Sequence, residues 1–239
     1  MHRFYAQPQN FSDETVVLDA DETRHLRDVL RLSVGEEVSV FDGTGREALA
    51  TVMETGKKTT LLSIIEETAP ASPESPLEIT LAPTVLNGER YDLIIQKSVE
   101  LGVTRLVPIH TVRCDVKLKD AARRLERWRR IALEATKQCG RARLMKVGEP
   151  TEFFDLIDQQ AAKQIFMFSE RGGANFPDGV PGDKITVVYG PKGGWEDSEL
   201  EAARSAGVRV VTLGGRIMRA ETAAIAITAI LQHRFGDLN

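Results

Sequence analysis

Two apolar segments in the last third of the chain end abruptly at glycines, and they constrain the fold more than any other part of the sequence. Residues 185–189 lead into Gly190-Pro-Lys-Gly-Gly194, and residues 208–213 lead into Gly214-Gly215. Short runs of β-branched and other apolar residues without polar alternation are typical of strands buried on both faces of a parallel sheet. A segment with helical character follows each glycine loop, so we expect two strand–loop–helix units. In open α/β sheets ligands bind at the carboxyl ends of the strands, and glycine there leaves the main chain accessible.

The two glycine loops are accompanied by polar side chains that an ordinary turn does not require: Arg216, Arg219, Glu221 and Thr222. A single Gly-Gly pair usually marks only a turn, but glycines combined with these side chains favour a binding site. The sequence has no Gly-x-Gly-x-x-Gly after a first strand and no Gly-x-x-x-x-Gly-Lys-Ser/Thr. Neither a dinucleotide-binding fold nor a phosphate-binding P-loop is therefore predicted.

Strand and helix patterns alternate through the rest of the C-terminal part of the sequence. We expect further strands at 77–82, 103–109 and 164–168, and helices at 90–101, 125–139 and 221–231. This alternation predicts a mostly parallel sheet covered by helices on both faces. The helix at 221–231 consists of Ala, Ile and Thr almost throughout, so we expect it to be enclosed on every side.

Residues 1–68 have a different pattern, which predicts a small, barrel-like β domain. Strands at 38–40, 48–52 and 59–65 are separated by glycine turns. One helix is expected at 21–31, capped by Asp21 or its neighbour, with an apolar face of Leu26, Val29 and Leu30. Residues 69–76 contain three prolines, which fit neither a helix nor a central strand. We therefore expect a linker at 69–76 and a second domain at 77–239.

The overall composition limits the classes of function. The 239 residues carry a net charge of −4, which by itself argues against a nucleic-acid partner. Cys114 and Cys139 stand far apart and the four histidines show no metal-ligand spacing, so neither a redox pair nor a metal site is expected. No apolar run reaches membrane-spanning length and the N-terminus lacks the core of a signal peptide, which predicts a cytoplasmic protein.

The charge is distributed unevenly, and one segment is strongly basic. Residues 113–146 contain twelve Lys or Arg and four Asp or Glu, although the whole chain is acidic. A charge run is usually a solvated helix face, but the local field and not the net charge decides whether a polyanion can dock. Arg3 stands beside Phe4 and Tyr5, outside this segment. A basic residue next to aromatic ones suits RNA phosphates and bases.

Three motifs resemble the signatures of the RsmE family. They are Gly190-Pro-Lys-Gly-Gly194, Leu213-Gly-Gly-Arg-Ile-Met-Arg-Ala-Glu-Thr-Ala223 and Arg234-Phe-Gly-Asp-Leu238, and the resemblance extends along nearly the whole chain. It implies an α/β fold, with a C-terminal trefoil knot of the SPOUT superfamily built on a parallel sheet and a PUA-like β-barrel domain before it. It further implies a homodimer that uses S-adenosylmethionine to methylate N3 of a uridine in the 16S ribosomal RNA of the small subunit.

The resemblance also implies roles for individual residues. Arg219 and Glu221 would be catalytic, placing the base and handling its proton. The residues implied in S-adenosylmethionine binding are Phe168, Ser169, Gly190, Pro191, Gly193, Gly194, Leu213, Gly214, Arg216, Ile217, Met218 and Thr222. Those implied in RNA binding are Arg3, His25, Arg31, Gln138, Arg141 and Arg143.

Two lysines depart from the family pattern. Lys137 and Lys192 stand where the family usually has Glu, and each exchange reverses the charge within a motif. Either these side chains face away from the site, or cofactor affinity, substrate choice or activity has changed. Three functions therefore stay open: the 16S rRNA methyltransferase, a related methyltransferase acting on another RNA such as tRNA, and a non-catalytic RNA-binding or ribosome-assembly protein of the same fold.

Overall fold

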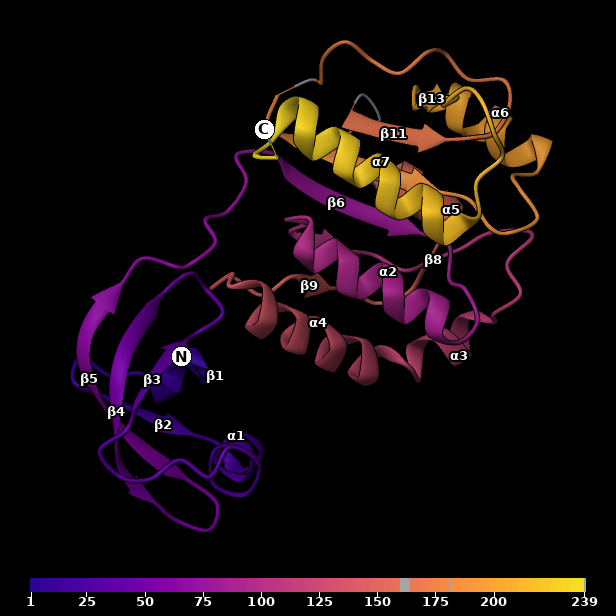
Figure 1. The fold of residues 1–239 in the computed structure, drawn as a ribbon. Helices are drawn as coiled ribbons and strands as arrows, with labels where there is room; N and C mark the ends of the chain where they lie inside the picture. Colours follow the sequence, from indigo (N-terminus) through magenta and orange to yellow (C-terminus); the bar gives the residue numbers. More distant parts are fainter. Residues whose placement is uncertain (160–163, 181, 239) are drawn as a thin grey trace. The chain divides into compact units, whose positions relative to one another are not determined.

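The chain folds into two compact units (Figure 1). The computed structural model describes residues 1–159, 164–180 and 182–238. Unit 1 comprises Met1–Glu74 and Thr136–Leu144, and unit 2 comprises Ser75–Ala135 and Met145–Asn239. The N-terminal unit therefore includes a short segment from the middle of the sequence.

Unit 1 is built on a five-stranded sheet in the order β1-β3-β4-β5-β2. β1 pairs with β3 in parallel and the remaining neighbours are antiparallel. The register between β4 and β5 shifts at two places, and such bulges bend and twist a sheet. Alternate strand residues are buried and form one apolar core, as the sequence pattern predicts. The strands are β1 (Arg3–Tyr5), β2 (Thr15–Leu18), β3 (Glu37–Phe41), β4 (Glu47–Thr55) and β5 (Thr60–Thr68).

The helix expected at 21–31 has a different start, end and apolar face. It begins as α1 (Ala20–Arg24), capped by the carboxylate of Asp19 rather than by Asp21, and continues as a π-helical turn over His25–Val29. The π turn widens the helix and rotates its following residues. Leu26 is therefore fully buried, whereas Val29, predicted on the apolar face, is 67% exposed.

Unit 2 is organised around a six-stranded sheet in the order β13-β11-β12-β6-β7-β9, in which neighbouring strands run parallel within the described residues. The strand expected at 103–109 is divided in two, because Pro108 cannot donate a ladder hydrogen bond. Its first part, β7, joins the large sheet, and its second part, β8, pairs with β10. The strands are β6 (Glu78–Pro83), β7 (Arg105–Leu106), β8 (Ile109–His110), β9 (Lys146–Val147), β10 (Thr151–Glu152), β11 (Ile165–Phe168), β12 (Lys184–Tyr189) and β13 (Arg209–Val211).

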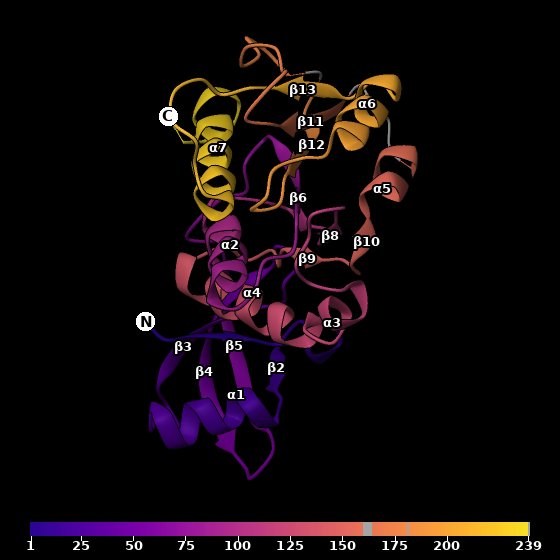
Figure 2. The same cartoon turned by 90° about the vertical axis from the view of Figure 1, so that its right-hand side faces the viewer.

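Helices cover both faces of the large sheet, as predicted for a parallel sheet (Figure 2). α2 and α7 lie on one face, where Tyr91 of α2 also packs on Trp128 of α4 with ring centroids 4.7 Å apart. α5 and α6 lie on the other face, and their apolar residues share one core with Met167 and Val188 of the central strands. The helices of unit 2 are α2 (Glu89–Glu100), α3 (Leu118–Ala122), α5 (Phe153–Gln159), α6 (Asp197–Ser205) and α7 (Ala220–Phe235), and α4 (Leu125–Cys139) starts here and ends in unit 1.

α7 is less enclosed than its composition predicts. One side packs on α2 and β12, and Ile227 and Leu231 there are buried. Ile225 and Ile230 are only partly buried, so this chain covers the helix incompletely. No helix within the described ranges is long and apolar enough to cross a membrane.

Candidate active site

Three neighbouring strands of unit 2 end side by side. Phe168 at the end of β11 lies opposite Tyr189 of β12 on one side and Val211 of β13 on the other. Because these strands are parallel, the loops that follow them emerge at one edge of the sheet. They enclose a cavity of about 610 Å³, together with the start of α7 and Arg90 of α2.

The cavity brings together nearly all of the residues that the sequence predicts for the cofactor and for catalysis. Arg219 and Glu221 both line it. Both glycine loops also line this one cavity, although α6 separates them in the sequence. Thr222, also predicted to bind the cofactor, is exposed and does not line the cavity. The predicted cofactor residues that line it are Phe168, Ser169, Gly190, Pro191, Gly193, Gly194, Leu213, Gly214, Arg216, Ile217 and Met218.

Trp195 shapes the first glycine loop. Its ring is buried, and its Nε1 donates a hydrogen bond of 2.8 Å to the carbonyl oxygen of Phe168, which ties the loop to the end of β11. A Cβ atom at Gly190 would lie 2.8 Å from the Trp195 ring, closer than real contacts. Gly194 adopts φ +73°, a conformation that favours glycine. Gly190 is thus required by the packing of Trp195, and Gly194 by the backbone conformation of the loop.

The second glycine loop is different, because it has space around it. A Cβ atom at Gly214 would meet no other atom within 4 Å. Within the described residues, no backbone N–H group from Leu213 to Arg219 donates a hydrogen bond to the backbone. A run of exposed N–H groups facing a cavity can bind the oxygen and nitrogen atoms of a ligand.

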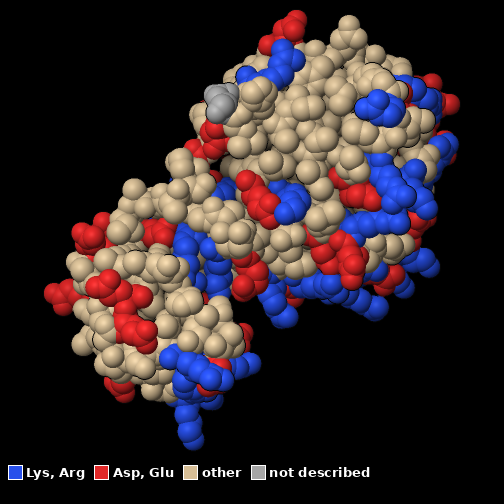
Figure 3. All heavy atoms as spheres, in the orientation of Figure 1, with Lys and Arg blue, Asp and Glu red and all other residues tan. Residues whose placement is uncertain are grey.

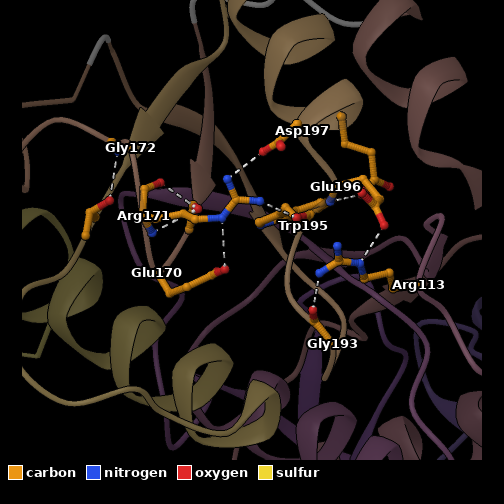
Figure 4. Close-up of polar contacts among 12 residues, drawn as sticks. Arg113, Glu170, Arg171, Gly172, Gly193, Trp195, Glu196 and Asp197 are labelled. Carbon is orange, nitrogen blue, oxygen red and sulfur yellow. Dashed lines mark hydrogen bonds and ion pairs between the residues drawn. The ribbon is translucent and has the colours of Figure 1, made fainter.

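Two arginines hold the first loop in place (Figure 4). Arg171, just after β11, donates hydrogen bonds to Asp197 (2.6 Å) and to the carbonyl oxygen of Trp195 (2.9 Å). The bond from Arg171 lowers the pKa of the Asp197 carboxyl group. Arg113 donates to the carbonyl oxygen of Gly193 at 2.7 Å from the opposite side of the loop.

A buried carboxylate completes this support. Glu199 of α6 is fully buried and accepts hydrogen bonds from the backbone N–H groups of Val112 and Glu196, each at 2.9 Å. The Glu196 side chain in turn accepts a hydrogen bond of 2.7 Å from Arg113. The start of α6, the glycine loop and the segment after β8 are therefore linked by charged groups.

The two predicted catalytic side chains lie in different surroundings. Arg219 precedes α7, is exposed, and its side chain makes no hydrogen bond or ion pair with any residue that the structure describes. The Glu221 side chain is 13% exposed and lies 3.8 Å from Nε of Arg90. Arg219 can therefore reach a ligand in the cavity, whereas the Glu221 carboxylate lies near the guanidinium of Arg90.

The Cys114 thiol and the Tyr189 phenol are not activated as nucleophiles. Burial raises the pKa of the Cys114 thiol, and burial raises the pKa of the Tyr189 phenol, whose oxygen lies 3.4 Å from the Thr228 hydroxyl. Both groups stay protonated near neutral pH. Among the described residues there is also no group of three His, Cys, Asp or Glu side chains that could hold a metal ion.

All six predicted RNA-binding residues lie in unit 1. Arg3 donates to both carboxylate oxygens of Glu47 at 2.8 Å, and to the carbonyl oxygens of Thr136 (2.9 Å) and Arg141 (2.7 Å). The Arg141 side chain is 3% exposed and forms an ion pair of 2.6 Å with Glu74. Arg3 and Arg141 thus attach the segment Thr136–Leu144 to the rest of unit 1, and a direct contact with RNA stays a prediction for both.

The other predicted RNA-binding residues are more accessible. Arg31, Gln138 and Arg143 are exposed, and Arg31 adopts a left-handed backbone conformation with φ +57°. His25 is partly buried, with its ring 5.9 Å from that of Phe4. These four positions stay candidates for RNA contact.

Lys137, the first departure from the family pattern, has a structural explanation within unit 1. Its Nζ lies 2.8 Å from Oε1 of Glu22, and each side chain of this pair is only 8% exposed. A carboxylate on helix α1 therefore compensates the reversed charge. Lys192, the second departure, is exposed and lines the cavity of unit 2.

Comparison with known proteins supplies the family. The sequence matches the RNA methyltransferase domain family over residues 73–232 and an RNA methyltransferase PUA domain family over residues 18–65. It is 33% identical to ribosomal RNA small subunit methyltransferase E of Synechocystis over 93% of this chain and 74% of the relative. It is 30% identical to the Aquifex aeolicus protein of the same name over 98% of this chain and the whole relative. The chain belongs to the RsmE family of RNA methyltransferases.

Solved structures extend this result to the fold of this RsmE-family protein. It matches ribosomal RNA small subunit methyltransferase E from Neisseria gonorrhoeae, crystallised with S-adenosylmethionine, with a TM-score of 0.91, 37% identity and full coverage of both chains. A methyltransferase from Legionella pneumophila in complex with the same cofactor matches with a TM-score of 0.89 and 29% identity over 98% of each chain. The predicted family and fold class, an α/β domain with a parallel sheet and a PUA-like domain, are confirmed.

The cavity of this RsmE-family protein fits S-adenosylmethionine. Its volume is in the range of small-molecule sites. Its lining combines apolar side chains, among them Leu213, Ile217 and Ile227, with the free backbone N–H groups of the second glycine loop, which suits an adenine ring beside a charged amino-acid tail. The open space at Gly214 allows a ligand to approach the main chain closely.

Sequence reasoning missed three arginines of this site: Arg90, Arg113 and Arg171. Arg90 follows Gly88 beyond the carboxyl end of β6, a position that the strand pattern could have indicated. Arg113 and Arg171 act on partners 80 and 24 residues away, and no local sequence signal identifies such pairs.

Proposed function

We propose that this RsmE-family chain transfers the methyl group of S-adenosylmethionine to N3 of a uridine in 16S ribosomal RNA. The observation that carries the proposal is that Arg219 and Glu221 line the same cavity as both glycine loops. S-adenosylmethionine as cofactor is supported by the two solved neighbours that bind it, and the ribosomal substrate by the names of the relatives. N3 as the target atom rests on the resemblance of the motifs.

The proposed reaction needs the N3 proton to leave, since a protonated uracil N3 is a poor nucleophile. We expect the Glu221 carboxylate, which lines the cavity near Arg90, to accept that proton. The guanidinium of Arg219 is free to donate hydrogen bonds to a uracil carbonyl oxygen and to stabilise the charge that develops on the base. The bound cofactor supplies an electrophilic methyl group on a sulfonium. The glycine loops hold the reacting partners in one orientation, which contributes much of the rate.

The proposal is tested with small ribosomal subunits from a strain that lacks its own enzyme. The purified protein and S-adenosylmethionine with a labelled methyl group should label this RNA, and mapping should find one N3-methyluridine. Subunits from the parent strain, which are already methylated, are the control and should take up no label. Label found instead on tRNA would support the related methyltransferase, and cofactor binding without transfer to either RNA would support a non-catalytic protein.

We further propose that the protein works as a homodimer in the cytoplasm, where small subunits are available, with residues 1–68 and 77–239 as its functional domains. The partly buried isoleucines of α7 support the dimer, because an apolar helix face that one chain leaves open can be covered by a second copy. Light scattering of the purified protein would contradict the dimer if it gave the mass of one chain.

A further inference from the structure

The cations of the basic segment 113–146 fall into two groups in the structure of unit 2. Arg127 and Arg129 on α4 are held by carboxylates, with Arg127 lying 2.5 Å from Asp92. Lys117 and Lys119, beside and on α3, are exposed and have no ion pair with any residue that the structure describes. Such unpaired cations are available to a partner.

Two hollows extend from the candidate active site towards these unpaired cations. The first, of about 490 Å³, shares Lys192 and Gly193 with the cofactor cavity. The second, of about 330 Å³, shares Asp115 with the first and includes Lys117 and Lys119 in its lining. The three hollows therefore follow one another along the surface of unit 2.

Together the two outer hollows are strongly positive. Their lining contains two carboxylates, Asp115 and Asp120, and six cations: Arg113, Lys117, Lys119, Arg123, Arg124 and Lys192. Asp120 lies 3.5 Å from Arg123, and Arg113 is engaged with Glu196. Figure 3 shows Lys and Arg side chains gathering along the margin of unit 2 over α3 and α4. The positive field persists here although the whole chain carries a net charge of −4.

The chemistry of the lining selects the part of a nucleic acid that would fit. Neither hollow is lined by an aromatic side chain, so stacking of bases is not provided for. Lysine and arginine in open hollows are suited to phosphate oxygens, which position a nucleic acid without reading its sequence. The sugar–phosphate backbone is thus the ligand that this surface fits.

We propose that the RNA strand next to the target uridine runs along these two hollows, with its phosphates on Lys192 at the mouth of the site and on Lys117, Lys119 and Arg124 beyond it. This inference rests on the proposed function and names the path of the substrate on unit 2. It also gives Lys192 a role, because the reversal from the family's usual Glu adds a cation where the strand enters the site.

The test removes three charges from the hollows and three from the same basic segment outside them. The hollow variant is Lys117→Gln/Lys119→Gln/Arg124→Gln, and the matched control is Arg127→Gln/Arg129→Gln/Arg130→Gln, none of whose residues lines the hollows. Affinity for a small-subunit rRNA fragment is measured by fluorescence anisotropy between about 50 and 200 mM salt. Calorimetry with S-adenosylmethionine and thermal melting are run on each protein.

The hollow variant should bind the RNA at least about tenfold more weakly. The magnitude of the slope of log K against log salt should decrease by about 2, which corresponds to three lost phosphate contacts. The control should change RNA affinity less than about threefold. A separate Lys192→Gln variant should raise KM for rRNA. Cofactor affinity and melting temperature should match wild type in the triple variants.

Equal RNA affinity and salt slope in the hollow variant and the control would overturn the proposed path. Failure of the proposed function gives a different result. In that case the wild-type protein itself would not transfer methyl groups, whatever the RNA affinities of the variants.

Discussion

Arg171 connects the ends of two strands through a single side chain. It follows β11 and holds the carbonyl oxygen of Trp195, in the loop after β12, and the side chain of Asp197, the first residue of α6. Because these bonds fix the loop rather than contact the reacting atoms, we expect Arg171→Ala to raise KM for S-adenosylmethionine roughly tenfold while kcat changes little. Arg171→Lys keeps a charge near Asp197 but loses the second bond, so it should fall between wild type and Arg171→Ala.

Steady-state kinetics with the cofactor as varied substrate measures this effect. Arg46→Ala, which removes an exposed ion pair with Glu67 in unit 1, is the control and should leave KM for the cofactor unchanged. An unchanged KM in Arg171→Ala would show that the loop keeps its shape without this residue.

Arg219 should act on the base and not on the cofactor. Its side chain lines the cavity without an internal partner among the described residues, so we expect Arg219→Ala to lower kcat by about 10² to 10³-fold. Calorimetry should find cofactor affinity within about threefold of wild type, since the glycine loops are intact. Full turnover in this variant would remove Arg219 from the catalytic group.

The sequence could predict the loops of the site but not the charged groups that support them. Glycine after an apolar strand is a local signal, and residues 190–194 and 213–218, which it indicated, line the cavity. The contact between Arg113 and Gly193 depends on the tertiary arrangement of segments 80 residues apart, which no periodicity encodes. Lys137 is similar, since its partner Glu22 lies 115 residues away.

At the scale of structural elements, the two glycine loops should respond differently to an added methyl group. Gly190→Ala places a Cβ atom 2.8 Å from the buried ring of Trp195, so we expect a loss of about 1–3 kcal/mol in the free energy of unfolding. Gly214→Ala meets no atom within 4 Å and should leave stability within about 0.5 kcal/mol of wild type.

The binding of S-adenosylmethionine, unlike stability, should be sensitive to the change at Gly214. Gly214→Ala fills the space through which the ligand approaches the main chain, so we expect affinity for S-adenosylmethionine to fall about tenfold. Chemical denaturation and calorimetry on both variants separate the two effects. Tight cofactor binding by a stable Gly214→Ala protein would contradict a backbone role for the second loop.

Most elements followed from the sequence pattern, and the exceptions have local causes. The helix at 125–139 and the strands β6, β11, β12 and β13 of the parallel sheet lie within a few residues of their predicted ranges. The two-residue strand β9 (Lys146–Val147) was not predicted. Pro108 divides one expected strand, and a π turn at His25–Val29 rotates Val29 out of the core. The π turn could not be predicted, because an inserted residue in a helix leaves the apolar periodicity almost unchanged over so short a span.

For the whole molecule, the proposed dimer makes α7 the element to test. Ile230→Glu adds a charge to the partly buried side of the helix, and we expect the mass from light scattering to fall from two chains to one. Val29→Glu, at a residue that is 67% exposed in unit 1, is the control and should keep the dimer. A persistent dimer in Ile230→Glu would move the interface elsewhere.

Helix α4 starts in unit 2, and its last residues, Thr136–Cys139, belong to unit 1. Unit 1 is therefore not built from one continuous stretch of the polypeptide. A fragment that stops at Glu74 keeps all five strands of unit 1 but loses the carbonyl groups that accept from Arg3 and the lysine that neutralises Glu22. Recombination between relatives at the proline-rich segment would separate these partners. We expect viable chimaeras to need two additional crossovers, one on each side of residues 136–144. Residues 1–74 and 136–144 would then come from the same parent.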